Sequence, residues 1–162
     1  VERETDGREP SVRCINFGLD GMQSFSFTLE EERSAVLVPA GQVGTYLYEP
    51  NAAVLKAGAF KQIAVRTGVK KLQVNSHLYT ADHLVSDFPG RRFRVDEVLS
   101  FTGKLCKGLS KTIPQANITV RNFPLSVEEL RKRTKITDGG HVYLFATTLV
   151  DGEKVLVKCS KA

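Results

Sequence analysis

The stretch that decides the fold is Tyr46-Leu-Tyr-Glu-Pro-Asn-Ala-Ala-Val-Leu-Lys-Ala-Gly-Ala-Phe60. A proline disfavours helical backbone in the residue before it, so residues 46–49 are predicted to be extended. The asparagine that follows can cap a helix, which small and apolar residues at helical spacing continue to residue 67, before Gly68. We therefore predict a strand, a cap and one central helix whose small side chains let another backbone pack closely. The residues with predicted structural roles are Tyr48, Pro50, Asn51 and Gly58.

Upstream of this stretch, alternating side chains over residues 11–17 and 23–28 predict a β-hairpin, with Asp20-Gly21 favouring a tight turn. Its apolar face, which needs a cover, is formed by Val12, Cys14, Phe25 and Phe27. Residues 30–32 are expected to form a solvated acidic turn. Residues 34–38 are expected to form a third strand.

Downstream of residue 90 the pattern is regular and predicts the order βαβαββ. Strands are expected at residues 92–100, 116–121, 142–149 and 154–158, and helices at residues 103–111 and 127–133. Ser126 and Glu129 fit a capping box at the start of the second helix. We predict an α+β fold, an α/β sandwich, with an N-terminal β-hairpin unit, a central helix and this βαβαββ unit. Its sheet should be mixed, with residues 116–120 and 142–149 as central strands.

Composition and cysteine usage are those of an ordinary globular chain, with 41% hydrophobic and 25% charged residues. No apolar run approaches the roughly 20 residues of a membrane span, so we expect a cytoplasmic chain without membrane contact. Three widely spaced cysteines and the lack of CxxC or HxxxH spacing predict buried, reduced thiols and no metal site. The chain begins with Val1 and has one methionine, so we expect a preceding N-terminal part.

Charge is distributed unevenly along the chain. Residues 1–50 carry four Arg against nine acids, whereas the remaining 112 residues carry 19 Lys and Arg against nine acids. This asymmetry indicates two units with different surroundings, and the basic one could bind a polyanion. A solvated basic surface is the alternative, since cations also favour helix C-termini. The residues predicted to contact nucleic acid are Lys104, Lys107, Arg121, Arg131, Lys132, Arg133 and Lys135.

No set of catalytic residues follows from the sequence. Neither GxGxxG nor GxxxxGK[ST] occurs, so we expect no cofactor in this chain. A polar cluster could bind a ligand or supply acid and base groups, and it consists of His77, Tyr79, Thr80, Asp82 and His83. A loop whose side chains satisfy nearby backbone groups is the simpler interpretation. An independent small-molecule enzyme, which would depend on this cluster, is therefore our third hypothesis.

Four stretches carry a resemblance to a known family: residues 46–58, Ala116-Asn-Ile-Thr-Val-Arg121-Asn-Phe-Pro, Val127-Glu-Glu-Leu-Arg131 and Tyr143-Leu-Phe-Ala-Thr-Thr148. Together they resemble the C-terminal region of a family of predicted bacterial methyltransferases. In that family a class I S-adenosylmethionine-dependent domain precedes a small ferredoxin-like unit and a THUMP-like domain. The resemblance implies that residues 1–45 are closing β-strands of a methyltransferase domain, residues 46–90 the ferredoxin-like unit and residues 91–162 the THUMP-like domain.

The resemblance also implies a function. THUMP domains are RNA-binding modules of RNA-modifying enzymes, which implies a substrate-recognition module that binds tRNA or rRNA. Its other partner would be its own N-terminal methyltransferase domain, which would hold S-adenosylmethionine. We expect the chain to be inactive alone. The alternative is a structural, protein-docking or dimerisation module, which would use the apolar face that carries Phe25 and Phe27.

Overall fold

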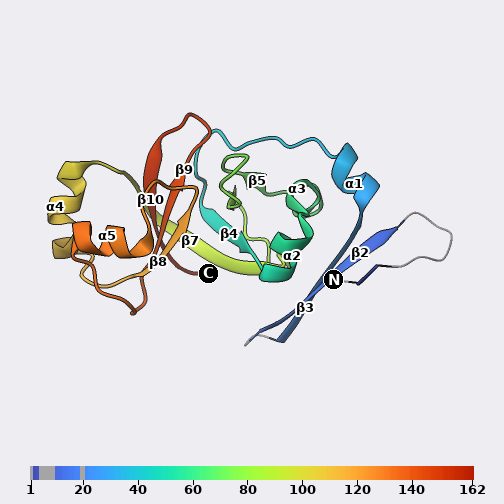
Figure 1. Cartoon of the computed structure of the whole chain (residues 1–162), viewed down its shortest axis with the longest axis horizontal. Coiled ribbons are helices and arrows are strands. Elements are labelled where there is room, and N and C mark those ends of the chain that lie inside the picture. The colour runs from blue at the N-terminus through green and yellow to red at the C-terminus, as the bar shows by residue number, and fades with distance from the viewer. Residues whose placement is uncertain (1, 4–9, 19–20) are drawn as a thin grey trace.

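The structure, a computed structural model, describes residues 2–3, 10–18 and 21–162. These residues form a three-stranded sheet, a seven-stranded sheet and five short helices (Figure 1). The three-stranded sheet lies at one end of the molecule, and helices α4 and α5 lie at the other. The α+β class predicted from the sequence is confirmed.

The N-terminal sheet consists of β1 (Glu2–Arg3), β2 (Ser11–Gly18) and β3 (Gly21–Thr28), all antiparallel. The predicted hairpin is confirmed, with Cys14 opposite Phe25, although its turn at residues 19–20 lies outside the described residues. The apolar face is buried in a core that also contains Val54 and Ile63 of the following helices. The chain itself therefore covers this face.

Two predictions for the next segment are wrong. Residues 30–32 belong to a helix, α1 (Leu29–Ser34), because Thr28 and Glu31 form a capping box in which each side chain accepts the other's backbone N–H. Residues 34–38, all within the described part, contain no strand, and only Pro39 forms a single bridge to Lys71. Val36 and Val38 are exposed and lack the neighbouring strand that would bury them.

The central stretch forms β4 (Tyr46–Pro50), α2 (Ala52–Ala57) and α3 (Phe60–Thr67). The extended segment and the Asn51 cap are confirmed, whereas the single long helix is wrong. Gly58 adopts a left-handed conformation with φ 72°, which ends α2 and reorients the chain. A Cβ added to Gly58 would meet nothing within 4 Å, so this glycine serves the turn rather than close packing.

The seven-stranded sheet joins this stretch to the C-terminal part of the chain. Its order is β5-β6-β4-β7-β10-β9-β8, with β5 (Lys70–Lys71), β6 (Tyr79–Ala81) and β7 (Gly90–Ser100). β7 pairs with β4 along one edge and with β10 along the other, both antiparallel. One continuous sheet therefore runs through the molecule.

The predicted βαβαββ order is confirmed by β7, α4 (Gly103–Thr112), β8 (Asn117–Arg121), α5 (Val127–Thr134), β9 (Tyr143–Thr148) and β10 (Lys154–Lys161). The sheet is mixed, because β8 and β9 are parallel while β9 and β10 are antiparallel. β9, predicted to be central, is an interior strand that lies between β10 and the edge strand β8. The prediction that residues 116–120 form a central strand is wrong: β8 is the edge strand and half-buried throughout.

Separate cores cover the two faces of the C-terminal half of the sheet. Leu109 of α4 and Leu130 of α5 pack with Leu144 and Leu156 on one face. Phe93 and Phe145 pack on the other. All three cysteines are free and buried as predicted, and burial raises the pKa of Cys159 to about 12. Of the helices in the described residues, none has the length and apolar character to span a membrane.

Candidate nucleic-acid interface

Three lysines line one side of α4. Thr102 caps this helix by accepting the Leu105 N–H at 3.1 Å, and Cys106 and Leu109 are buried beneath it. The lysines are exposed and occur at i, i+3 and i+7, so they share a helix face. They are Lys104, Lys107 and Lys111.

The C-terminal end of α5 adds three exposed cations, Lys132, Arg133 and Lys135. α4 and α5 pack against each other. The two helices lie at the same end of the molecule (Figure 1). The cations of the two helices therefore belong to one surface. We call it the α4–α5 basic surface, and it consists of Lys104, Lys107, Lys111, Lys132, Arg133 and Lys135.

Among the described residues, none of these six cations forms an ion pair. The acids of α5 lie in its first turn, where Glu129 accepts the Ser126 N–H as part of the predicted capping box. This hydrogen bond lowers the pKa of the Glu129 carboxyl. The acids thus gather at one end of the helix and the cations at the other.

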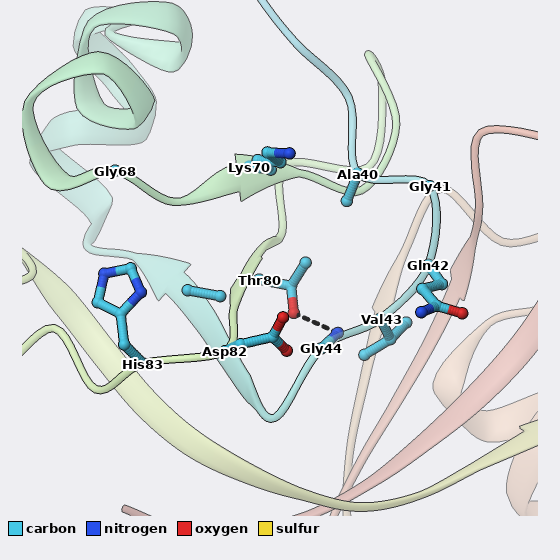
Figure 2. Close-up of a pocket in the computed structure, with 11 residues that line it drawn as sticks. Ala40, Gly41, Gln42, Val43, Gly44, Gly68, Lys70, Thr80, Asp82 and His83 are labelled. Atoms are coloured by element: carbon cyan, nitrogen blue, oxygen red, sulfur yellow. Dashed lines mark hydrogen bonds between the residues drawn. The ribbon is translucent and has the colours of Figure 1, made fainter.

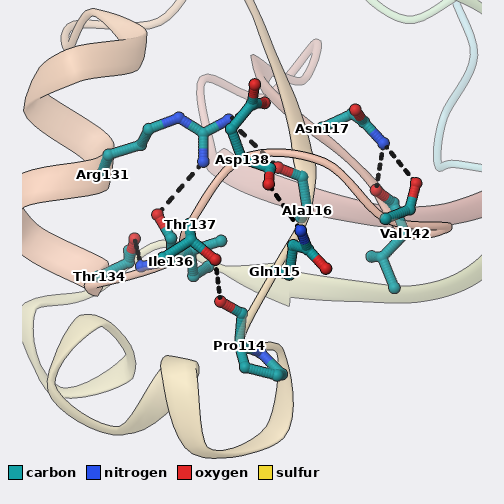
Figure 3. A network of polar contacts seen from close by, with 11 residues as sticks. Pro114, Gln115, Ala116, Asn117, Arg131, Thr134, Ile136, Thr137, Asp138 and Val142 are labelled. Atoms are coloured by element: carbon teal, nitrogen blue, oxygen red, sulfur yellow. Dashed lines mark hydrogen bonds and ion pairs between the residues drawn. The ribbon is translucent and has the colours of Figure 1, made fainter.

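Arg131, predicted as a nucleic-acid contact, instead ties α5 to the loop that follows it (Figure 3). Its guanidinium donates to the carbonyls of Ile136 at 3.2 Å and Ala116 at 3.1 Å, and it pairs with Asp138 at 2.9 Å. Its side chain is only 22% exposed. Arg131 is therefore a structural residue beside the α4–α5 basic surface.

Arg121, also predicted as a contact, lies on the other side of the sheet. Its neighbour Val120 packs in the core beneath α4 and α5, and successive side chains of a strand point to opposite faces. Arg121 pairs with Glu49 of β4 at 3.2 Å, and Arg91 of β7 pairs with the same carboxylate at 2.7 Å. This ion-pair cluster was missed from the sequence, because its three members are far apart along the chain.

The polar cluster around residue 80 is divided between core and surface. His77 stacks on Phe60 with ring centroids 4.1 Å apart, and the Tyr79 hydroxyl donates to the Phe60 carbonyl at 2.6 Å. Burial, together with the charges of Lys71 and Arg121, lowers the pKa of His77.

The other members of this cluster border a pocket of about 690 Å³ (Figure 2). Thr80 Oγ1 accepts the Gly44 N–H at 2.8 Å, and Asp82 Oδ1 accepts the Thr45 N–H at 3.2 Å. These side chains accept from backbone N–H groups that lie 36 and 37 positions earlier in the chain. No metal-binding group of His, Cys, Asp or Glu occurs within the part of the chain that the structure describes.

Three of the residues with predicted structural roles, Tyr48, Asn51 and Pro50, make contacts between elements. The Tyr48 hydroxyl donates to the His83 carbonyl at 2.9 Å and accepts the Val85 N–H at 2.8 Å. Asn51 accepts the Val54 N–H at 3.0 Å, and its amide donates to Gln23 of the hairpin at 3.0 Å. Pro50 ends β4 opposite Gly90.

Comparison with known proteins places this geometry in context. Residues 46–89 match the family of a ferredoxin-like domain, and residues 90–161 match a family described as THUMP domain-like. The crystal structure of a predicted methyltransferase from Porphyromonas gingivalis W83 is 48% identical, with a TM-score of 0.89. The match covers 94% of this chain and 38% of that one, so the chain spans well under half of this relative's length. No curated protein matches the chain.

Proposed function

Since the chain belongs, over residues 46–161, to the ferredoxin-like and THUMP-like region of a family of predicted methyltransferases, we propose that it is the RNA-recognising part of such an enzyme. The α4–α5 basic surface carries this proposal. Its cations are exposed and without ion-pair partners among the described residues, and they lie within the THUMP-like segment. Lysine and arginine side chains in such a cluster neutralise phosphates and release counterions, which supplies most sequence-independent affinity.

In this proposal, methyl transfer takes place in a separate domain of the whole enzyme, which binds S-adenosylmethionine, the methyl donor. The residues of this chain hold the RNA and orient it toward that domain. Backbone phosphates are the group that the α4–α5 basic surface recognises, because its side chains are point charges on two helix faces rather than a pocket for a base. tRNA and rRNA fragments are the first RNAs to test.

The alternative of a docking or dimerisation module rested on the apolar face of the hairpin. That face is covered by α2 and α3 within the same chain, and Phe27 is only 2% exposed. A protein partner therefore does not need to cover it. RNA recognition remains the function that the exposed cations support best.

The proposal is tested by removing charge from one surface at a time. One variant carries Lys104→Gln, Lys107→Gln, Lys132→Gln and Arg133→Gln. A matched control removes the same charge from exposed positions elsewhere, with Arg13→Gln, Lys56→Gln, Lys70→Gln and Arg94→Gln. In fluorescence anisotropy with labelled tRNA at low salt, the first variant should lose at least about tenfold in affinity and the control much less. Equal losses would reject the α4–α5 basic surface as the binding site.

A further inference from the structure

A second basic site lies in a cleft between the hairpin, the end of β4 and the face of the seven-stranded sheet opposite α4 and α5. The cleft has a volume of about 560 Å³, which is within the range of small-ligand sites. Asn16 and Gln23 of the hairpin form one wall. Arg91, Arg121 and Lys161, from β7, β8 and β10, bring three cations to the other.

The cleft contains one acidic side chain in addition to these three cations. Glu49 is the only acidic side chain among the described residues that line the cleft, and it is 9% exposed. Arg91 Nε and Nη2 both donate to Glu49 Oε1, at 2.8 and 2.7 Å, and Arg121 Nη2 donates to Oε2 at 3.2 Å. The cleft therefore keeps an excess of two positive charges.

The arginines retain unused hydrogen-bond donors. Arg121 Nε is buried and has no partner among the described residues, although a guanidinium carries five N–H donors in a fixed fork. A buried donor without a partner is costly, so Arg121 Nε favours a ligand that supplies an acceptor oxygen.

We propose that this cleft binds a phosphate ester of nucleotide size, held by Arg91, Arg121 and Lys161. Arginine forks match the paired oxygens of a phosphate, and the Glu49 carboxylate occupies the same kind of position in the free protein. Glu49 thus keeps the guanidiniums in place and competes with the ligand for them. This site is separate from the α4–α5 basic surface. The proposal that it binds a phosphate ester does not depend on RNA binding through that surface.

Isothermal titration calorimetry at fixed ionic strength tests the site, with adenosine 5′-monophosphate as the probe and adenosine as the probe without phosphate. The monophosphate should bind saturably and adenosine should not. Lys161→Gln, a change at an exposed side chain, should weaken binding about tenfold, because it removes a charge-assisted contact. Glu49→Gln should strengthen binding, because it removes the competing negative charge, whereas a purely structural role for Glu49 would weaken it.

Lys70→Gln on β5 is the matched control, because it removes one exposed positive charge outside both the cleft and the α4–α5 basic surface and should leave monophosphate binding unchanged. The proposal is overturned if the monophosphate does not bind, if adenosine binds equally well, or if Lys161→Gln and Lys70→Gln have the same effect. Lys161→Gln decides the matter if Glu49→Gln does not fold. If a single-stranded RNA oligonucleotide displaces the monophosphate, the phosphate that the site binds belongs to an RNA strand. If the oligonucleotide does not displace it, the ligand is a free nucleotide.

Discussion

Gly90 marks a very close approach of β7 to the end of β4. A Cβ added there would lie on the Glu49 carbonyl oxygen and against Pro50, and these backbone atoms cannot swing aside. We expect Gly90→Ala to lower the free energy of unfolding by about 2–3 kcal/mol, the scale of overpacking. Gly108→Ala is the control: its Cβ would meet nothing within 4 Å in α4, so it should stabilise by about 0.5–1 kcal/mol. Urea denaturation measures both, and a neutral Gly90→Ala would contradict this close approach.

Lys71 is a cation with only 2% of its surface exposed. Its ammonium donates to the Val74 carbonyl at 2.6 Å and lies 4.7 Å from the Phe60 ring centroid. Burial lowers its pKa from 10.5 to about 8, against the opposing charge of Glu32. The unfolded chain keeps this proton up to about pH 10.5, whereas the folded chain releases it from about pH 8. The destabilising effect of the buried charge is therefore complete below pH 8 and is relieved as pH rises toward 10.5.

A comparison with Lys71→Met isolates this effect, because other titrating groups contribute equally to both proteins. The stability of the wild-type protein relative to Lys71→Met should rise between pH 7 and pH 10, measured by urea denaturation at several pH values. A difference that is constant across this range would show that Lys71 keeps its ordinary pKa in the folded protein.

At the scale of elements, the end of α5 shows how neighbouring cations differ in role. We expect Arg131→Ala to lower stability by about 1–3 kcal/mol, because it leaves the Ile136 and Ala116 carbonyls without their donor. Lys132→Ala, one residue along on the exposed side, should change stability by less than about 0.5 kcal/mol. Thermal melting of the two variants checks the contrast, and equal melting temperatures would mean that the Arg131 contacts contribute little.

The sequence predicted most elements because their ends carry local signals. Asn51 and Ser126 begin helices through caps that involve residues three positions away. The capping box of Thr28 and Glu31 carries the same kind of signal and was overlooked in favour of the acidic composition. Gly58 was assigned to packing because its left-handed φ is not visible in a run of small residues.

The roles of the charged residues could not be predicted in the same way. A run of cations in the sequence indicates only positive charge. In the structure the 136–138 loop folds back beside α5, so Arg131 is hydrogen-bonded to this loop whereas Lys132 is exposed and can contact a partner. The pairing of Glu49 with Arg121 joins residues 72 positions apart. Such contacts depend on strand order, which periodicity does not contain, and for the same reason β8 was predicted to be central.

At the scale of the whole molecule, the continuous sheet predicts how the chain unfolds. β7 pairs with β4 over residues 90–94 and with β10 over residues 93–100, so the first strand of the THUMP-like segment is hydrogen-bonded to a strand of the ferredoxin-like segment. We expect a single cooperative transition in differential scanning calorimetry, with equal calorimetric and van't Hoff enthalpies. Two separate transitions would show that the two segments are thermodynamically independent.

RNA binding through the α4–α5 basic surface is the central claim, and the salt dependence of affinity tests it most directly. The measurement is the slope of log affinity against log salt concentration, for the wild-type protein and for the variant with Gln at Lys104, Lys107, Lys132 and Arg133. Each lost phosphate contact lowers the steepness by about 0.7–0.9, so the slope should become shallower by about 3 if all four side chains contact phosphates. Two folded proteins with the same slope would contradict the claim.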